Sequence, residues 1–281
     1  MRSTSKVVKY VAIALGLILA IFIISVIVKT ALSLFGAFGH FGNNTAGSVV
    51  TNKEFSQEFN GVTTLDLDFS AGYLEIQKGD VFKVEGYNLP SNFTAEQKVD
   101  TLKIKDSIKD PVNFLNALSD SKKPHLTVTI PEGAAFKEVE LAFGASDTSI
   151  DTLKTGRLKV DMGVGRVEMS SIIADNAKFN NGAGEVILSD MKINDMDMEC
   201  GVGRVSFEGS LTGKNKIDGG VGETTFAING NAADFDIKGE PGLGELTVDG
   251  SRYTKDRFRN SGAPNSLEIN GGVGSLRIAF E

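Results

Sequence analysis

Three carboxylates and one amide recur at a fixed interval and could supply acid–base chemistry. They are evenly spaced along the chain, at Asp161, Asn180, Glu199 and Asp218. Hydrolysis of a glycosidic bond requires two carboxyl groups at a defined separation, so this column is the best candidate for a polysaccharide-acting enzyme. Its residues alternate with apolar ones, which predicts that they face solvent, and we expect no aromatic or cationic cluster beside them to hold a sugar. We therefore predict no catalytic residues.

Short glycine phrases raise two ligand hypotheses, and each lacks a required part. A dinucleotide-binding fingerprint needs a third glycine and a following helix, whereas a strand pattern follows here. Calcium-binding repeats that read GGxG need an aspartate two residues after the last glycine. The corresponding residues after Gly219–Gly222 and Gly271–Gly274 are Thr224 and Leu276. We expect neither a nucleotide cofactor nor repeated calcium sites.

The chain contains one cysteine, Cys200, and two histidines, His40 and His125. A single cysteine excludes an intrachain disulfide. No histidine or second cysteine lies near Cys200 in the repeat, so a stacked structural position is favoured over a reactive thiol. The sequence shows neither a Ser/His/Asp set nor a histidine-containing metal cluster, and we expect no metal.

Charge is distributed unevenly along the 281 residues, whose net charge is −7. The first 29 residues carry four basic residues and no acidic one, which leaves a net charge of −11 on the remainder. An acidic remainder without a basic stripe argues against binding to nucleic acid and against docking on anionic lipid headgroups.

The spacing of the acidic column also organises the middle of the chain. A glycine phrase recurs there, with its second glycine at positions 165, 184, 203 and 222. Two of the columns at this spacing are entirely apolar: Leu141, Val160, Phe179, Met198 and Ile217, and Ile150, Met169, Leu188, Phe207 and Phe226. Apolar and polar residues alternate around each phrase, as is typical of strands with one buried face.

A unit of this size, with two short strands and a glycine turn, cannot bury its apolar face alone and must stack on its neighbours. We therefore predict an all-β fold: a parallel β-solenoid, or β-helix, with coils of about 19 residues. Adjacent coils should lie about 4.8 Å apart with equivalent side chains in register.

A column of charged residues follows the second glycine of each phrase, and its sign alternates at every step. It consists of Asp147, Arg166, Glu185, Arg204 and Glu223. Like charges directly opposite each other on paired strands are destabilising, so the alternation predicts a surface charge ladder. The alternative is an accidental pattern on a solvated face. Each exposed pair contributes only about 0 to 1 kcal/mol, so the ladder would set register rather than stability.

Glycine is expected at each corner because the chain turns there while pressing against the coils above and below. The predicted structural turn glycines are Gly72, Gly163, Gly165, Gly182, Gly184, Gly201, Gly203, Gly220, Gly222, Gly242, Gly244, Gly272 and Gly274. The middle residue of each phrase, such as Val164 or Val202, is apolar and is expected to point inward.

The amino-terminal region has the features of a membrane anchor. Residues 10–28 are apolar apart from Gly16 and Ser25, and this run is long enough to cross a bilayer as a helix. We predict a basic cytoplasmic tail over 1–9, a single transmembrane anchor over 10–29 and a juxtamembrane stalk over 30–58. The basic tail predicts a cytoplasmic amino terminus. An uncleaved anchor is favoured over a cleaved signal peptide because the apolar run exceeds the usual length of a signal-peptide core.

The β-solenoid domain is predicted over 59–281, with an irregular insertion at 88–123. Within that insertion, apolar residues at helical spacing over 111–119 predict a short helix. The phrase returns later as Gly242–Gly244 and Gly272–Gly274, at wider intervals than in the centre. Terminal coils are expected to be atypical because they must cap an open edge.

The order of an apolar anchor, a strand with a Pro-Glu-Gly turn over Leu126–Gly133, and repeated GxG phrases resembles the bacterial putative-adhesin family, whose domain has no assigned function. That resemblance implies a membrane-anchored β-solenoid of the cell envelope and offers no catalytic residues. The likeness covers roughly residues 59–281.

These features predict a non-enzymatic protein of the cell membrane, with its solenoid outside the cytoplasm. We expect an adhesin-like interaction or envelope-scaffold module whose partner is an envelope protein or a glycan. The alternatives are a structural protein that polymerises through its terminal coils, a regulator of envelope stress and, less favoured, a polysaccharide-acting β-helix enzyme.

Overall fold

The computed structural model describes residues 53–106 and 123–281. Four predictions lie outside the described residues: the cytoplasmic tail at 1–9, the anchor at 10–29, the stalk over 30–52 and the helix over 111–119. Within the part that is described, no helix is long and apolar enough to cross a membrane. The chain divides into two units, Met1–Ser48 and Val49–Glu281, and the described residues all belong to the second.

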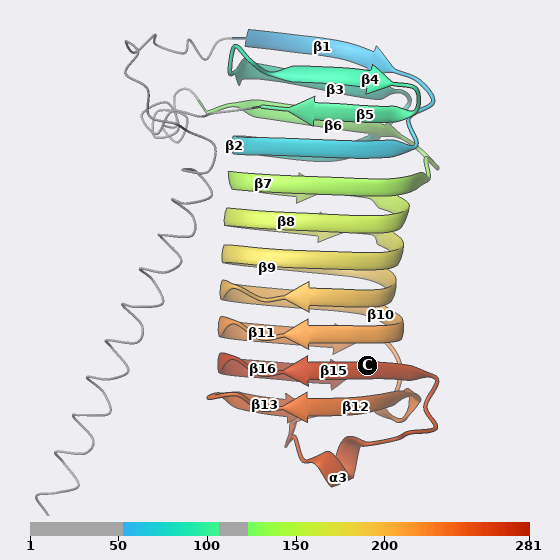
Figure 1. The fold of residues 1–281 in the computed structure, drawn as a ribbon, viewed down its shortest axis with the longest axis vertical. Coiled ribbons are helices and arrows are strands. Elements are labelled where there is room, and N and C mark those ends of the chain that lie inside the picture. Colours follow the sequence, from blue (N-terminus) through green and yellow to red (C-terminus); the bar gives the residue numbers. More distant parts are fainter. Residues whose placement is uncertain (1–52, 107–122) are drawn as a thin grey trace, which may run out of the picture. The chain divides into compact units, whose positions relative to one another are not determined.

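Long strands form the centre of the fold, and the first three of them continue through a glycine corner (Figure 1). They are β7 (Phe136–Ile150), β8 (Leu153–Ser170), β9 (Ile172–Glu199) and β10 (Val202–Asp218). Each pairs in parallel with the next, and residues around the corner pair 19 apart, as Val160 with Phe179 and Gly184 with Gly203. Between two bulges of the β9–β10 pair the spacing is 18, as for Met191 with Gly209. The predicted solenoid and its repeating register are therefore confirmed in the centre.

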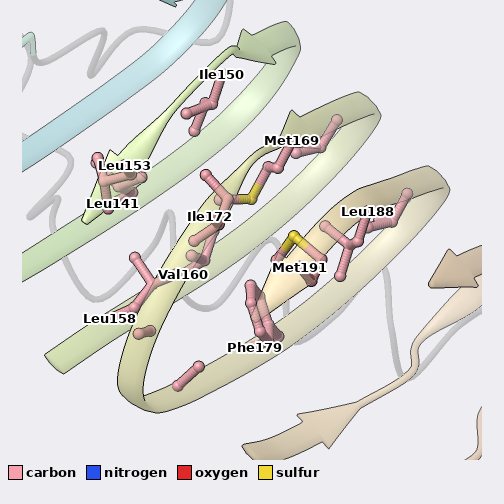
Figure 2. Close-up of a cluster of buried hydrophobic side chains, with 14 of the residues drawn as sticks. Leu141, Ile150, Leu153, Leu158, Val160, Met169, Ile172, Phe179, Leu188 and Met191 are labelled. Carbon is pink, nitrogen blue, oxygen red and sulfur yellow. The ribbon is translucent and has the colours of Figure 1, made fainter. Parts of the chain in front are cut away.

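The hydrophobic core fills the space between the two sides of each coil. Val160, before the corner, and Met169, after it, both point inward and are at most 1% exposed. Figure 2 shows these side chains stacked with their equivalents from neighbouring coils. Full burial of an aliphatic or aromatic side chain contributes about 1.5–3 kcal/mol, so the repeated inward columns stabilise the stack.

The amino-terminal end corrects the prediction of a wholly parallel solenoid. Its strands are β1 (Lys53–Phe59), β2 (Thr64–Gly79), β3 (Phe82–Leu89), β4 (Thr94–Lys98), β5 (Thr101–Lys105) and β6 (His125–Pro131). Strand β2 pairs in parallel with β5, β6 and β7, but β3 is antiparallel to β1 and β6, and β4 is antiparallel to β5. Only Asp80 and Val81 connect β2 to β3, too few residues for the chain to return and start a parallel strand.

The predicted insertion at 88–123 is also corrected, because part of it belongs to the stack. Strand β5 lies in register against β2, and its Leu102 and Ile104 are completely buried. Phe93, just before β4, is completely buried as well. The interval pattern does not detect this segment because its strands are joined by a hairpin rather than by a glycine corner.

At the carboxyl-terminal end, the order of the strands in space differs from their order in the sequence. The elements are β11 (Val221–Ile228), η1 (Ala232–Asp234), β12 (Phe235–Glu240), β13 (Glu245–Val248), β14 (Ser251–Arg252), α3 (Lys255–Phe258), β15 (Asn265–Asn270) and β16 (Val273–Phe280). Strands β15 and β16 insert between the last regular coil and the coil made by β12 and β13 (Figure 1). The last strand of the sequence is therefore an interior strand.

Candidate interaction surface

The corner glycines lie so close to the next coil that no side chain fits. At Gly184 the φ angle is +140°, and an added Cβ would lie 1.9 Å from the carbonyl oxygen of Gly165. Positive φ occurs at six predicted corner glycines: Gly72, Gly165, Gly184, Gly203, Gly222 and Gly274. At the other seven, an added Cβ would lie 1.8–2.2 Å from a backbone oxygen: Gly163, Gly182, Gly201, Gly220, Gly242, Gly244 and Gly272.

The middle residues of the glycine phrases point outward, which overturns the inward orientation expected for them. Val164 is 62% exposed, Val221 38% and Val273 44%. The cause is the bend at the corner: Met162 and Val167 are both buried, so the side chains between them face away from the core. Equivalent residues of successive coils are paired and form a row that we call the corner ridge: Ala145, Val164, Ala183, Val202, Val221 and Val273.

The predicted charge ladder lies on the strand face that follows the ridge, with each residue paired in register to the next. Glu185 accepts hydrogen bonds from Arg166 on one side and from Arg204, at 3.1 Å, on the other. The Arg204 Nε atom lies 3.8 Å from a carboxylate oxygen of Glu223. Asp147 is paired with Arg166 in the register of β7 and β8. These exposed contacts contribute little free energy each, but a one-coil slip would oppose like charges.

An aromatic stack extends the same row toward the amino-terminal end. Tyr73 pairs with Asp147 on one side and with His125 on the other, and His125 pairs with Tyr87. The His125 ring stacks between the two tyrosines, with centroid distances of 4.6 Å to Tyr73 and 4.3 Å to Tyr87. Tyr73 and Tyr87 are 37% and 49% exposed. The row thus joins an exposed aromatic patch directly to the charge ladder.

The surroundings of this stack are cationic. Lys123 Nζ lies 4.8 Å from the centroid of the Tyr73 ring and donates a hydrogen bond to the Tyr73 hydroxyl at 3.2 Å. Partial burial, together with the charge of Lys123, lowers the pKa of His125 below its usual value. The imidazole is therefore neutral at physiological pH and acts as an aromatic element of the stack.

Sequence reasoning missed the aromatic stack, although part of the signal was present. Tyr73 follows Gly72 just as Arg166 follows Gly165, so extending the ladder column backward would have found it. Tyr87 lies on an antiparallel strand, and no glycine phrase precedes His125. Neither position can be reached by counting along the repeat interval.

At the other end the row continues through Ser275, which pairs with Glu223, to Glu245, which pairs with Ser275. Arg277, two residues beyond Ser275, donates a hydrogen bond to Glu223. We call the complete series from Tyr87 to Glu245 the ladder row, and the strand surface that carries it the ladder face.

The acidic column lies on the strands before the corner, away from the ladder face. Burial raises the pKa of Asp161, but hydrogen bonds from Lys159 and Asn180 outweigh it and leave the pKa below its usual value. Burial also raises the pKa of Asp218, but hydrogen bonds from Lys216 and Asn270 outweigh this effect, so the pKa again lies below its usual value. Cationic side chains therefore do lie beside this column, contrary to expectation, and they keep these carboxylates ionised. A general acid requires the opposite shift.

Other sites that could do chemistry are limited in the described part of the chain. Burial raises the pKa of the Cys200 thiol to about 11, so the thiol stays protonated and unreactive. Within residues 53–106 and 123–281, no three His, Cys, Asp or Glu side chains are placed to bind a metal ion. A hollow lined by Gly222, Gly244 and Gly274 has room for about one water molecule.

Comparison with known proteins places the chain in a family. The sequence profile of the Toastrack DUF4097 family matches residues 62–254, so the chain belongs to this family, which confirms the family resemblance drawn from the glycine phrases. A putative adhesin from Bacteroides fragilis is similar in structure, with a TM-score of 0.46 and 15% identity over 83% of this chain and 100% of that one. A putative adhesin from Parabacteroides distasonis gives a TM-score of 0.31 and 11% identity over 83% and 98% of the two chains. No curated protein matches the chain.

Proposed function

We propose that this Toastrack DUF4097 protein is a non-enzymatic interaction module of the bacterial cell envelope. In this proposal residues 10–29 anchor the chain in the membrane, and the solenoid lies outside the cytoplasm, where it binds an envelope glycan or an envelope protein. The apolar run at 10–28, the basic residues before it and the acidic remainder support this arrangement.

The observation that carries the proposal is the ladder face. A regular stack places Tyr87, His125 and Tyr73 in one exposed row that continues into alternating charges. Exposed tyrosines combine a large apolar surface with a polar tip and are enriched where proteins bind partners. Because the row is built on paired strands, its side chains are already ordered before a partner arrives, which lowers the entropic cost of binding.

An adhesin-like role fits this surface better than catalysis does. Two carboxylates of the acidic column, Asp161 and Asp218, have a lowered pKa and are held ionised by lysine and amide partners, as Asp161 is by Lys159. The hollow at the corner glycines is too small for a sugar. An exposed row of ordered polar and aromatic side chains offers a surface for contact but no enclosed place for a reaction.

Retention on envelope material tests the proposal. Full-length protein in mild detergent would be incubated with purified cell-wall glycan and, separately, with solubilised envelope protein. We expect retention by one of them, and we expect Tyr73→Ala with Tyr87→Ala to reduce it about tenfold or more, since aromatic contacts often dominate an interface. Ile173→Ala is the matched control, because Ile173 is also exposed, at 41%, but lies away from the ladder row.

Two outcomes would contradict the proposal. Retention that is unchanged in the tyrosine variant but lost in the Ile173 variant would place binding on another surface. Release of soluble sugar fragments from the glycan, abolished by Asp161→Asn, would show that the acidic column is catalytic. A protease-protection assay on intact cells tests the orientation, since an amino terminus accessible from outside would exclude the proposed topology.

A further inference from the structure

The ladder row has a property that neither the repeat nor the proposed function requires. Its ten members follow one another in register across the ladder face: Tyr87, His125, Tyr73, Asp147, Arg166, Glu185, Arg204, Glu223, Ser275 and Glu245. The midpoint of this series falls between Arg166 and Glu185. If the row of a second copy runs in the opposite direction about that midpoint, each residue of the first row lies opposite a residue of complementary chemistry in the second.

Consider a two-fold axis that lies in the plane between two facing copies, passes over this midpoint and runs along the strands, perpendicular to the direction of stacking. Arg166 then meets Glu185 of a second copy, and Asp147 meets Arg204. Toward the ends, the Tyr73 hydroxyl meets the carboxylate of Glu223, while His125 meets Ser275 and Tyr87 meets Glu245. No like charges meet anywhere along the row.

The corner ridge is complementary about the same axis. Val164 meets Ala183 of the second copy, and Val202 meets Ala145, so these two valines each face a small side chain. Val164 is 62% exposed in the single chain and would be covered by this contact. The exposed valines of the ridge account for three of the large hydrophobic residues that are exposed in the described part of the chain. Alternating large and small residues is the arrangement that lets two surfaces interdigitate.

The outward row next to the ladder is compatible with the same axis. It runs Glu85, Thr127, Glu75, Ser149, Glu168, Ile187, Ser206, Thr225, Arg277 and Thr247. About the midpoint, Glu75 meets Thr225, Thr127 meets Arg277 and Ser149 meets Ser206. The least favourable pairing is Glu168 with Ile187, and Glu168 already has a partner within its own chain in Arg166.

We propose that the ladder face binds the ladder face of a second copy of this chain, antiparallel, about the axis between Arg166 and Glu185. The interface would be ten strands long, at about 4.8 Å per strand, and three outward side-chain positions wide. These dimensions correspond to roughly 800 Å² on each partner. That is the size of a standard protein–protein interface. An axis through a residue fails, since an axis through Glu185 opposes Arg166 to Arg204 and Asp147 to Glu223, and such contacts cost several kcal/mol. An axis midway between Glu185 and Arg204 also opposes opposite charges, but it pairs fewer members, and only the central axis pairs all ten.

The antiparallel pairing has a geometric consequence. Strand β1, where the described chain begins, lies at one end of the stack, so the two copies have their β1 strands at opposite ends. If the anchor of the proposed function is correct, this arrangement suits contact between two membranes, and the partner is then another copy of the protein itself. The self-pairing does not depend on that anchor or on any glycan.

Charge reversal tests the pairing, and a double exchange tests the position of the axis. Sedimentation velocity of the full-length chain in mild detergent, at low salt, is expected to show a monomer–dimer equilibrium. Arg166→Glu places a new carboxylate opposite the partner copy's Glu185, twice in each dimer, and we expect the dissociation constant to rise about tenfold or more. Arg157→Glu is the matched control, since Arg157 is exposed and pairs with Glu138 on the other side of the coil.

A double exchange separates this interface from a folding defect. In Arg166→Glu with Glu185→Arg, the two exchanged side chains still meet as opposite charges across the axis, so the variant should dimerise with itself. It should not pair with the wild-type chain, because the carboxylate introduced at position 166 would meet the wild-type Glu185. Differently tagged chains co-purified after mixing report this selectivity. A strictly monomeric wild type, equal dimerisation of the Arg166→Glu variant, or free mixing of exchanged and wild-type chains would each overturn the proposal.

Discussion

The central coils and the two ends of the solenoid use the same corner but different connections. In the centre, residues around the corner pair with those 19 positions later, as Val160 with Phe179. At the ends, Gly72 and Gly274 retain the positive φ of the corner, yet Gly222 pairs with Gly274, 52 positions later. The register of the strands is therefore set by the packing of the glycine corners and of the stacked side-chain columns. The order in which the coils follow one another in the sequence can differ without changing that register. The surface rows run unbroken from the ends into the centre for this reason.

The largest expected effect comes from removing the part of the amino-terminal end that was predicted to be an insertion. Deletion of residues 88–123 removes Phe93, Leu102 and Ile104, all completely buried. It also removes strand β5, which pairs with β2. We expect no cooperative unfolding transition by circular dichroism, since several core side chains, each contributing about 1.5–3 kcal/mol, are lost together. Deletion of residues 108–121 alone, which keeps β5 and β6, is the control and should leave a cooperative transition.

A substitution at a central corner is expected to cost several kcal/mol. Gly184→Val places a Cβ 1.9 Å from the carbonyl oxygen of Gly165, at a φ of +140°. Gly133→Ala is the comparison at an end, where φ is +76° and nothing lies within 4 Å of the added Cβ; it should cost about 1–2 kcal/mol. Urea unfolding of both variants measures the difference. Equal stability of the two would show that close stacking is not what requires glycine at the corner.

A buried carboxyl makes the amino-terminal end sensitive to pH. Asp106 is 2% exposed, and burial raises its pKa to about 7 despite a hydrogen bond from the Ser70 backbone amide at 2.6 Å. Because the folded state binds this proton more tightly than the unfolded chain does, stability falls as pH rises from about 4 to about 7. Asp106→Asn removes that loss and should gain about 2–4 kcal/mol over the wild type at pH 8, with little difference at pH 4.

Asp161 in the central coils has the opposite pKa shift. Burial raises its pKa, but hydrogen bonds from Lys159 and Asn180 lower it by more, so the pKa lies below its usual value. Asp161→Asn should therefore show the opposite dependence, with the variant losing stability relative to the wild type above the usual carboxyl pKa. Urea unfolding at a series of pH values measures both. If the two variants have the same pH profile, the ends and the centre do not differ in this respect.

The smallest expected effect concerns the charge ladder in a single chain. Arg204→Glu opposes like charges to Glu185 and Glu223, its neighbours at 3.1 and 3.8 Å. We expect a loss of about 1 kcal/mol or less, reduced further by salt, because the side chains are exposed. Thermal melts at low and high salt measure it. A loss that salt does not change would mean that the ladder acts through packing.

The sequence allowed accurate prediction where one interval repeats. The apolar columns, the corner glycines and the order of charges from Asp147 to Glu223 all follow from counting along that interval, since each coil pairs with the next in the chain. The ends could not be predicted in this way. Strand β15 inserts beside β10 although β11, β12, β13 and β14 separate the two in the sequence, and no local pattern carries that information.

The direction of the ridge valines was wrong for a physical reason. Simple alternation continued through the phrase would put Val164 inside, two residues after Met162, but the bend at Gly165 shifts the alternation. The aromatic stack was hidden because Tyr87 and His125 reach the ladder row through an antiparallel strand and a long connection. The candidate surface was therefore half predictable: its charges were visible and its aromatic end was not.

The central claim is that the ladder face is the surface this protein uses. Hydroxyl-radical footprinting of the full-length chain on intact cells, compared with the same chain diluted in detergent, tests it directly. We expect protection of Tyr73, Tyr87 and Val164, and no change at Ile173 and Val99, which are exposed elsewhere in the solenoid. Uniform labelling of all these side chains on cells, or protection confined to Ile173 and Val99, would contradict the claim.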